Sequence, residues 1–145
     1  LTLTSVGPSV SSLSPYLQSG SSVTIPVSGG SPPYQFSIQS GGGTIDPSTG
    51  HFTAAGVGVV TFSIVDSQGK STSASLEVVT ALSLTPNSGT IASFTNQTFS
   101  AAGGSGSYTY SLLNGLGGVI DAVTGFFTRP WASGTLSVRV TDSYG

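Results

Sequence analysis

The sequence predicts an all-β chain made of two tandem antiparallel β-sandwich domains. Three observations lead to this prediction. Motifs from the first half recur in the second half at a nearly constant spacing. Runs of alternating apolar and polar residues indicate short, half-buried strands. The 21 glycines and 8 prolines indicate many turns between these strands, and long helix-forming runs are absent.

The repeat is the strongest of these signals, because three blocks occur twice in the same order. Their offsets are 74, 75 and 76 residues, so two single-residue insertions explain the drift. Such self-similarity is typical of chains built from one repeated structural unit. The matching blocks are GGSPPYQFSI (29–38) with GGSGSYTYSL (103–112), IDPSTGHFT (45–53) with IDAVTGFFT (120–128), and DSQG (66–69) with DSYG (142–145).

Each predicted strand places its apolar residues at every second position, which turns them toward one face. In the first copy the predicted inward residues are Val23, Ile25 and Val27, then Tyr34, Phe36 and Ile38, then Val60, Phe62 and Ile64, and finally Ala74, Leu76 and Val78. In the second copy they are Gln97, Phe99 and Ala101, then Tyr108, Tyr110 and Leu112, then Leu136, Val138 and Val140.

The predicted domains are residues 1–79 and 80–145. No flexible insert separates them, so we expect a stiff string of elongated shape with little independent rotation. Copy one continues past Gly69 into a final strand, whereas copy two reaches Gly145 where that strand should begin. Two interpretations stay open: the sequence is cut there, or the strand is donated from elsewhere, such as a neighbouring chain.

These blocks resemble the Ig-like repeats of large bacterial surface proteins and haemagglutinin-like adhesins. The shared pattern is Gly-Gly-x-x-x-Tyr-x-Phe-Ser, then Gly-x-Ile-Asp-x-x-Thr-Gly-x-Phe-Thr, then a Val/Thr strand ending in Asp-Ser-x-Gly. The resemblance implies an Ig-like sandwich, similar also to cadherin-like domains. It further implies a role in stalks, fibres or adhesive arrays at the cell surface, where the partners are neighbouring repeats of the same polypeptide.

Composition excludes several classes of function. Only 6 % of the residues are charged, and three cations with a net charge of −2 cannot form a nucleic-acid footprint. No run of about 18 apolar residues occurs, so we expect no membrane insertion. The absence of cysteine excludes disulfides and thiolate metal sites. Together with the resemblance, this composition predicts an extracellular location.

The five acidic residues fall mostly at turns that both copies share. Asp46 and Asp121 open matching turns closed by glycine, and Asp66 and Asp142 end matching strands before Ser-x-Gly. Turn capping is the simpler interpretation of all four. The alternative is a weak calcium site at Asp66 and Asp142, although calcium needs about six to eight oxygen ligands. Otherwise no cofactor or metal is expected.

No catalytic arrangement can be assembled from these residues. His51 is the only histidine, and Phe126 occupies its place in the second copy, so the repeat does not depend on an imidazole. No nucleophile, base and orienting group can be brought together with any support. We therefore predict that the chain is not an enzyme.

One aromatic segment stands out as a candidate binding site. Trp131 follows Arg129 in a loop that begins soon after Phe126, and copy one has only Ala55 or Gly56 near the position of Trp131. A Trp in such a loop can stack on a sugar ring or a protein surface. It can equally cap the end of a small core.

The sequence thus predicts a non-catalytic spacer of an extracellular bacterial adhesin or fibre. The alternative is a carbohydrate- or protein-binding Ig-like module that uses exposed aromatic residues near Trp131. Its ligand would be a glycan or a surface protein.

Overall fold

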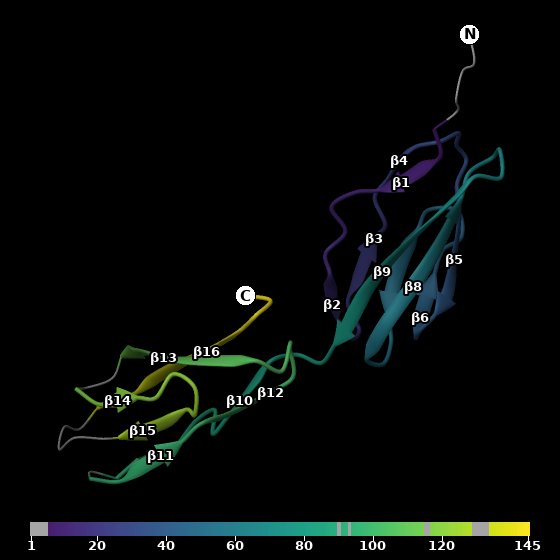
Figure 1. The fold of residues 1–145 in the computed structure, drawn as a ribbon. Coiled ribbons are helices and arrows are strands. Elements are labelled where there is room, and N and C mark those ends of the chain that lie inside the picture. Colours follow the sequence, from purple (N-terminus) through teal and green to yellow (C-terminus); the bar gives the residue numbers. More distant parts are fainter. Residues whose placement is uncertain (1–5, 90, 93, 115–116, 129–133) are drawn as a thin grey trace. The chain divides into compact units, whose positions relative to one another are not determined.

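The structure is a computed structural model, and it describes residues 6–89, 91–92, 94–114, 117–128 and 134–145. All regular elements in these ranges are β-strands, which confirms the predicted all-β class (Figure 1). Within the same ranges, no helix is long and apolar enough to cross a membrane. The chain divides into two compact parts, Leu1–Thr80 and Ala81–Gly145, which we call unit 1 and unit 2.

Unit 1 contains β1 to β9, arranged in three sheets. A four-stranded sheet has the order β2-β9-β8-β5, a three-stranded sheet has the order β3-β7-β6, and β1 pairs with β4. All pairs are antiparallel except β2 with β9, which is parallel. The strands are β1 (Pro8–Val10), β2 (Tyr16–Gln18), β3 (Ser22–Thr24), β4 (Val27–Gly29), β5 (Gln35–Ser40), β6 (Gly43–Ile45), β7 (His51–Ala54), β8 (Gly58–Val65) and β9 (Ser71–Val79).

The core of unit 1 lies between its two larger sheets. Phe62 on β8 and Phe52 on β7 are fully buried, and their ring centroids are 4.8 Å apart with an interplanar angle of 74°. This edge-to-face contact joins the four-stranded sheet to the three-stranded one. The predicted alternation is therefore confirmed on β8, where Val60 and Ile64 are also buried.

In the described parts of unit 2 the strands are β10 to β16, again in three sheets. These are β11-β15-β14, β13-β16 and β10-β12, all with antiparallel pairing. The strands are β10 (Ser83–Thr85), β11 (Asn96–Thr98), β12 (Ser100–Ala102), β13 (Tyr108–Asn114), β14 (Val119–Ile120), β15 (Phe126–Thr128) and β16 (Ser137–Asp142).

The core of unit 2 is thinner than that of unit 1. Its described buried hydrophobic residues are Phe99, Tyr110 and Phe127. Partly buried side chains pack around them, including Leu136, Val138 and Val140. These last three are the residues that the alternation of β16 predicts to point inward, and they do so without being fully covered.

Hydrogen bonds at matched positions show that the two units share one local plan. The Ile25 N–H donates to the Gly50 carbonyl, and the Phe99 N–H donates to the Gly125 carbonyl in the same way. The hydroxyl of Tyr34 donates to the carbonyl of Gly29 at 2.6 Å, five residues earlier in the chain. The matching bond in unit 2 joins Tyr108 to Gly103 at 2.8 Å.

Candidate functional site

Four aspartates are the main candidates for chemistry, and the structure gives each of them backbone partners. Among the residues that the structure describes, no three His, Asp or Glu side chains lie close enough together to hold a metal ion. His51 lies on the exposed side of β7, where its Nδ1 is 3.4 Å from the Thr24 hydroxyl on β3. This partner of the His51 ring is a cross-strand threonine and not a carboxylate.

Asp46 and Asp121 each cap the turn that they open. The Asp46 Oδ1 accepts the N–H groups of Ser48 at 2.8 Å and Thr49 at 2.9 Å, together with the Ser48 hydroxyl at 2.7 Å. Hydrogen bonds from the Ser48 side chain and from the backbone of Thr49 and Ser48 lower the pKa of Asp46 to about 2. Equivalent hydrogen bonds, of which those from the backbone and side chain of Thr124 are the most important, lower the pKa of Asp121 below its ordinary value.

Asp66 holds two distant segments of unit 1 together. Its side chain is only 5 % exposed. One carboxylate oxygen accepts the N–H of Ser31 at 3.1 Å, from the turn between β4 and β5. The other oxygen accepts the N–H groups of Gln68 at 3.0 Å and Lys70 at 2.8 Å, within its own turn. Burial raises the pKa of Asp66, but these three backbone bonds and the charge of Lys70 outweigh it, so the pKa is lowered.

Asp142 repeats this arrangement in unit 2. One oxygen accepts the Ser105 N–H at 2.8 Å and the other accepts the Tyr144 N–H at 3.1 Å. The glycine before each serine makes room for the carboxylate: Gly30 and Gly104 have φ values of 67° and 57°, and a Cβ on either would meet the aspartate oxygen. We call each arrangement of aspartate, glycine and serine backbone an aspartate clasp.

The clasps match the turn-capping role that the sequence favoured, and they extend it across the unit. Sequence reasoning found Asp66 and Asp142 but missed their partners in the Gly-Gly-Ser turns, although the recurrence of that block in both copies carried the signal. A calcium role for Asp66 and Asp142 stays a prediction. Both oxygens of each carboxylate already accept backbone N–H groups, so a cation would have to compete with these bonds.

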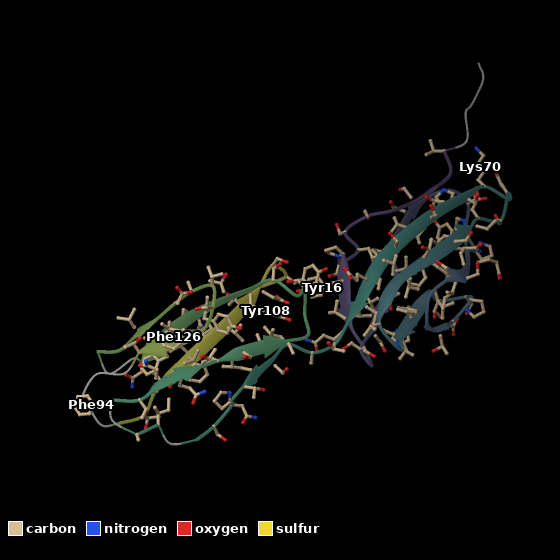
Figure 2. All side chains as sticks on the ribbon, turned by 60° about the horizontal axis from the view of Figure 1, so that its bottom comes forward. Tyr16, Lys70, Phe94, Tyr108 and Phe126 are labelled. Carbon is tan, nitrogen blue, oxygen red and sulfur yellow. The ribbon has the colours of Figure 1, made fainter. Side chains whose placement is uncertain are left out.

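The aromatic candidate falls partly outside the described residues. Trp131 and Arg129 lie in the range 129–133, which the structure does not describe. Phe126 is described: it lies on the outer side of β15 and is 42 % exposed (Figure 2). Its neighbour Phe127 points the other way and is buried.

Two valines of the same hairpin are exposed as well. Val119 on β14 is 70 % exposed and Val123 in the adjoining turn is 82 % exposed. Val119 pairs with Thr128 on β15, two residues from Phe126 and on the same outer side of the sheet. We call Val119, Val123 and Phe126 the outer apolar patch of unit 2. Sequence reasoning missed both valines.

Unit 1 carries polar residues at the corresponding positions of its own sheet. The aligned IDPSTGHFT and IDAVTGFFT blocks match Ser48 to Val123 and His51 to Phe126. One residue before each block, Thr44 matches Val119. All three residues of unit 1 are exposed. The fold therefore does not need apolar side chains at these sites. Folding alone does not explain why unit 2 has exposed apolar residues there.

No protein-family model matches the chain, and no curated protein matches it significantly. Among solved structures, it is similar to the C-terminal 282-residue fragment of intimin in complex with the intimin-binding domain of the translocated intimin receptor. The TM-score is 0.60 at 21 % identity, over 77 % of this chain and 47 % of that one.

Human protocadherin-24 EC1-2 aligns with a TM-score of 0.45 at 12 % identity, over 95 % of this chain and 94 % of that one. The chain thus spans about half of the intimin fragment to which it is similar. The likeness to intimin shows that the chain has an Ig-like β-sandwich fold.

Proposed function

We propose that the chain is a non-catalytic, adhesion-type module and acts as a spacer in an extracellular bacterial adhesin or fibre. The main supporting observation is that its aspartate side chains are engaged in backbone hydrogen bonds. Asp46, Asp66, Asp121 and Asp142 all accept backbone N–H groups at repeated positions. Residues committed to holding turns in both units serve the fold, and this leaves few groups for acid–base chemistry.

The connection between the units suits a spacer. Strand β9 ends at Val79 and β10 begins at Ser83, so residues 80–82 alone connect the last strand of unit 1 to the first strand of unit 2. A link this short leaves little slack for independent rotation. A spacer has to keep the parts on either side of it apart, and limited rotation at its junction serves this role better than a binding pocket would.

Small-angle scattering tests the spacer role. We expect the chain to give a narrow distribution of intramolecular distances. A variant with eight Gly/Ser residues inserted between Thr80 and Ala81 should give a broader one. The matched control carries the same insert after Gly56, an exposed residue on which a Cβ would meet no atom within 4 Å beyond its chain neighbours, and should behave like the parent. If parent and junction variant scatter alike, the spacer proposal is wrong.

A second candidate function is ligand binding by the outer apolar patch. At three matched, exposed positions unit 2 has apolar side chains where unit 1 has polar ones, and exposed apolar patches mark interaction sites on soluble proteins. The intimin fragment was solved with a receptor domain bound, so a protein of this fold can present a protein-binding surface. Trp131 and Arg129, which follow Phe126 closely in sequence, are the further candidate residues of this binding function.

Grafting the unit 1 residues onto unit 2 tests this candidate. The substitutions Phe126→His and Val123→Ser should remove binding on a glycan or surface-protein array without unfolding the domain, because unit 1 carries these residues at the same sites. Trp131→Ala should weaken binding too. The control is His51→Ser, which changes the equivalent position of unit 1. Equal binding by all four proteins would exclude the patch as a binding site.

A further inference from the structure

The outer side of strands β11 and β15 carries a row of four exposed side chains. Thr98 pairs with Phe126 across the two strands, and Asn96 pairs with Thr128. Directly opposed residues of an antiparallel pair share one face, and so do residues two apart along a strand. Phe127 takes the other face and is buried. We call the four exposed residues, Asn96, Thr98, Phe126 and Thr128, the outer row.

Unit 1 has a row at the same place, and its polar groups bond to one another. Ser22 pairs with Thr53, and their hydroxyls are 2.9 Å apart. Thr24 pairs with His51, and its hydroxyl is 3.4 Å from the Nδ1 of that ring. In the described part of unit 2, no side-chain hydrogen bond joins members of the outer row. Its amide and hydroxyl groups are therefore available to a ligand, around the aromatic ring of Phe126.

The turn before β11 adds a second exposed aromatic residue. The Thr95 N–H donates to the Ala92 carbonyl in this turn, and the turn before β3 in unit 1 has the matching bond. The two turns align Phe94 with Gly20. Gly20 has a φ of 85° and Phe94 a φ of 62°. The Phe94 side chain is 78 % exposed (Figure 2).

Phe94 therefore holds a backbone conformation that suits glycine. A positive φ brings Cβ against the following carbonyl group, so bulky residues rarely adopt it. The exposed ring gains little from burial in return. Strained residues of this kind are concentrated at ligand-binding and active sites. Because Gly20 stands at the same place in unit 1, the turn does not need an aromatic side chain in order to fold.

We propose that the outer row and Phe94 bind a neutral oligosaccharide. This inference rests on the binding function proposed for the outer apolar patch, with which it shares Phe126, and it names the class of ligand. The rings of Phe94 and Phe126 pack against the C–H faces of sugar rings. The Asn96 amide and the hydroxyls of Thr98 and Thr128 bond to the sugar hydroxyls.

The spacing of the two aromatic residues favours several linked sugars over a single one. Phe126 lies opposite Thr98, which is roughly 7 Å from Asn96 along β11. Phe94 lies two residues beyond Asn96 in the chain. A ligand that contacts both rings has to pass Asn96, and one sugar ring is too short for this.

The polarity of the outer row favours a neutral sugar over other ligands. Strands β11 and β15 contain no charged residue, so they offer nothing to attract an ionic ligand. A protein surface would bury the amide and both hydroxyls, and a buried polar group without a partner costs free energy. A sugar presents hydroxyls around its ring and can satisfy all three groups. A protein ligand is therefore the alternative that experiments have to separate.

The first experiment titrates the full chain with cello-, manno- and galacto-oligosaccharides of one to six units, followed by calorimetry and amide NMR. We expect saturable binding to at least one series, with at least tenfold higher affinity for the trisaccharide than for the single sugar. Amide shifts should appear at Asn96–Thr98 and Phe126–Thr128. Oligomers of galacturonate, which are acidic, should bind no better. Absence of saturable binding to all three neutral series, or tighter binding of the acidic oligomers, would overturn the proposal.

The second experiment exchanges single residues for those of unit 1. Phe126→His and Phe94→Gly should each weaken binding of the oligosaccharide at least fivefold. Phe94→Gly should also raise the Tm of unit 2, because glycine adopts a φ of 62° without strain. The matched control is His51→Ser, in the row of unit 1, and it should leave binding unchanged. Unaltered affinity in Phe94→Gly, or a lost affinity that comes with a lower Tm, would show that Phe94 is not a ligand contact.

A protein array with the same variants separates this inference from the proposed binding function. Binding to a protein that requires Phe126, without binding to any neutral oligosaccharide, would refute the sugar ligand. The outer apolar patch would then keep its proposed function as a protein-binding site. A chain that binds neither class of ligand would refute both proposals together.

Discussion

The carboxylate of Asp66 accepts the backbone N–H of Ser31 at 3.1 Å, although 35 residues separate them in the chain. Asp142 and Ser105 repeat the contact at 2.8 Å across 37 residues. Each aspartate clasp joins the turn at the end of one strand pair to the turn between two other strands. This polar contact therefore ties together two turns that are far apart in the chain.

Removing an aspartate clasp should destabilise the unit that contains it. Asp66→Ala leaves the N–H groups of Ser31, Gln68 and Lys70 without their carboxylate, and such donors are costly when water cannot replace the acceptor. We expect a lower Tm for unit 1 and no change in unit 2, as measured by calorimetry. Asp142→Ala should show the reverse.

Asp46→Ala is the control for this experiment. Asp46 also accepts backbone N–H groups, but its turn is exposed and water can take over the bonds. Its effect should be clearly smaller. Equal losses for Asp66→Ala and Asp46→Ala would show that the clasp contributes nothing beyond an ordinary turn.

The glycine of the clasp should tolerate no side chain. Gly30 has a φ of 67°, which costs other residues about 1–2 kcal/mol. A Cβ there would also lie 2.9 Å from the Pro8 nitrogen and 3.0 Å from the Asp66 Oδ2. Gly30→Ala should therefore lower the free energy of unfolding of unit 1 by about 2–4 kcal/mol in denaturant titrations.

Gly56→Ala separates the two causes. Gly56 has a φ of 77°, but a Cβ at this residue would have no other atom within 4 Å. The free energy of unfolding of the Gly56→Ala variant should fall only by the cost of the left-handed backbone conformation, about 1–2 kcal/mol. If the two variants are equally stable, close approach of the carboxylate is not what requires glycine at residue 30.

Local patterns in the sequence were sufficient to predict the faces of β8. Its apolar residues alternate, and a period of two depends only on neighbouring residues, so Val60, Phe62 and Ile64 point inward as expected. The same holds for the turn at Asp46, whose partners lie two and three residues away.

Long-range contacts could not be predicted in this way. The Asp66–Ser31 bond depends on which strands become neighbours, and no spacing in the sequence encodes that choice. Val119 was missed for a different reason: an apolar residue in a strand is expected to face inward, yet Ile120 takes the inward position and Val119 lies outside. Phe126 was found because it is an aromatic residue close to Trp131 in the sequence.

Acid should destabilise the fold through the turn aspartates. The pKa of Asp46 is lowered from an ordinary value of 3.8 to about 2, and those of Asp66 and Asp121 are lowered as well. A folded-state pKa below the unfolded value means that the stabilisation is complete above the unfolded pKa. It is lost as the pH falls through the folded-state value.

We therefore expect constant stability above about pH 5 and a progressive loss between about pH 4 and pH 2, measured by urea titration at each pH. Asp46→Asn should make this loss shallower, because one of the responsible carboxylates is gone. A parent protein whose stability does not change down to pH 2 would contradict the pKa values of all three groups.

Unit 2 should unfold before unit 1. Val60, Phe62 and Ile64 are at most 1 % exposed, whereas the matching Leu136, Val138 and Val140 are only partly buried, so unit 2 gains less from each apolar side chain. The single tryptophan of the sequence, Trp131, falls within the residue range of unit 2 and serves as its fluorescent probe. Its fluorescence should therefore change at a lower denaturant concentration than the last circular dichroism transition.

Phe62→Ala, which empties the core of unit 1, should cost that unit about 3–5 kcal/mol and bring the two transitions together. A single coincident transition in the parent protein would mean that the partial burial of the β16 side chains does not weaken their unit.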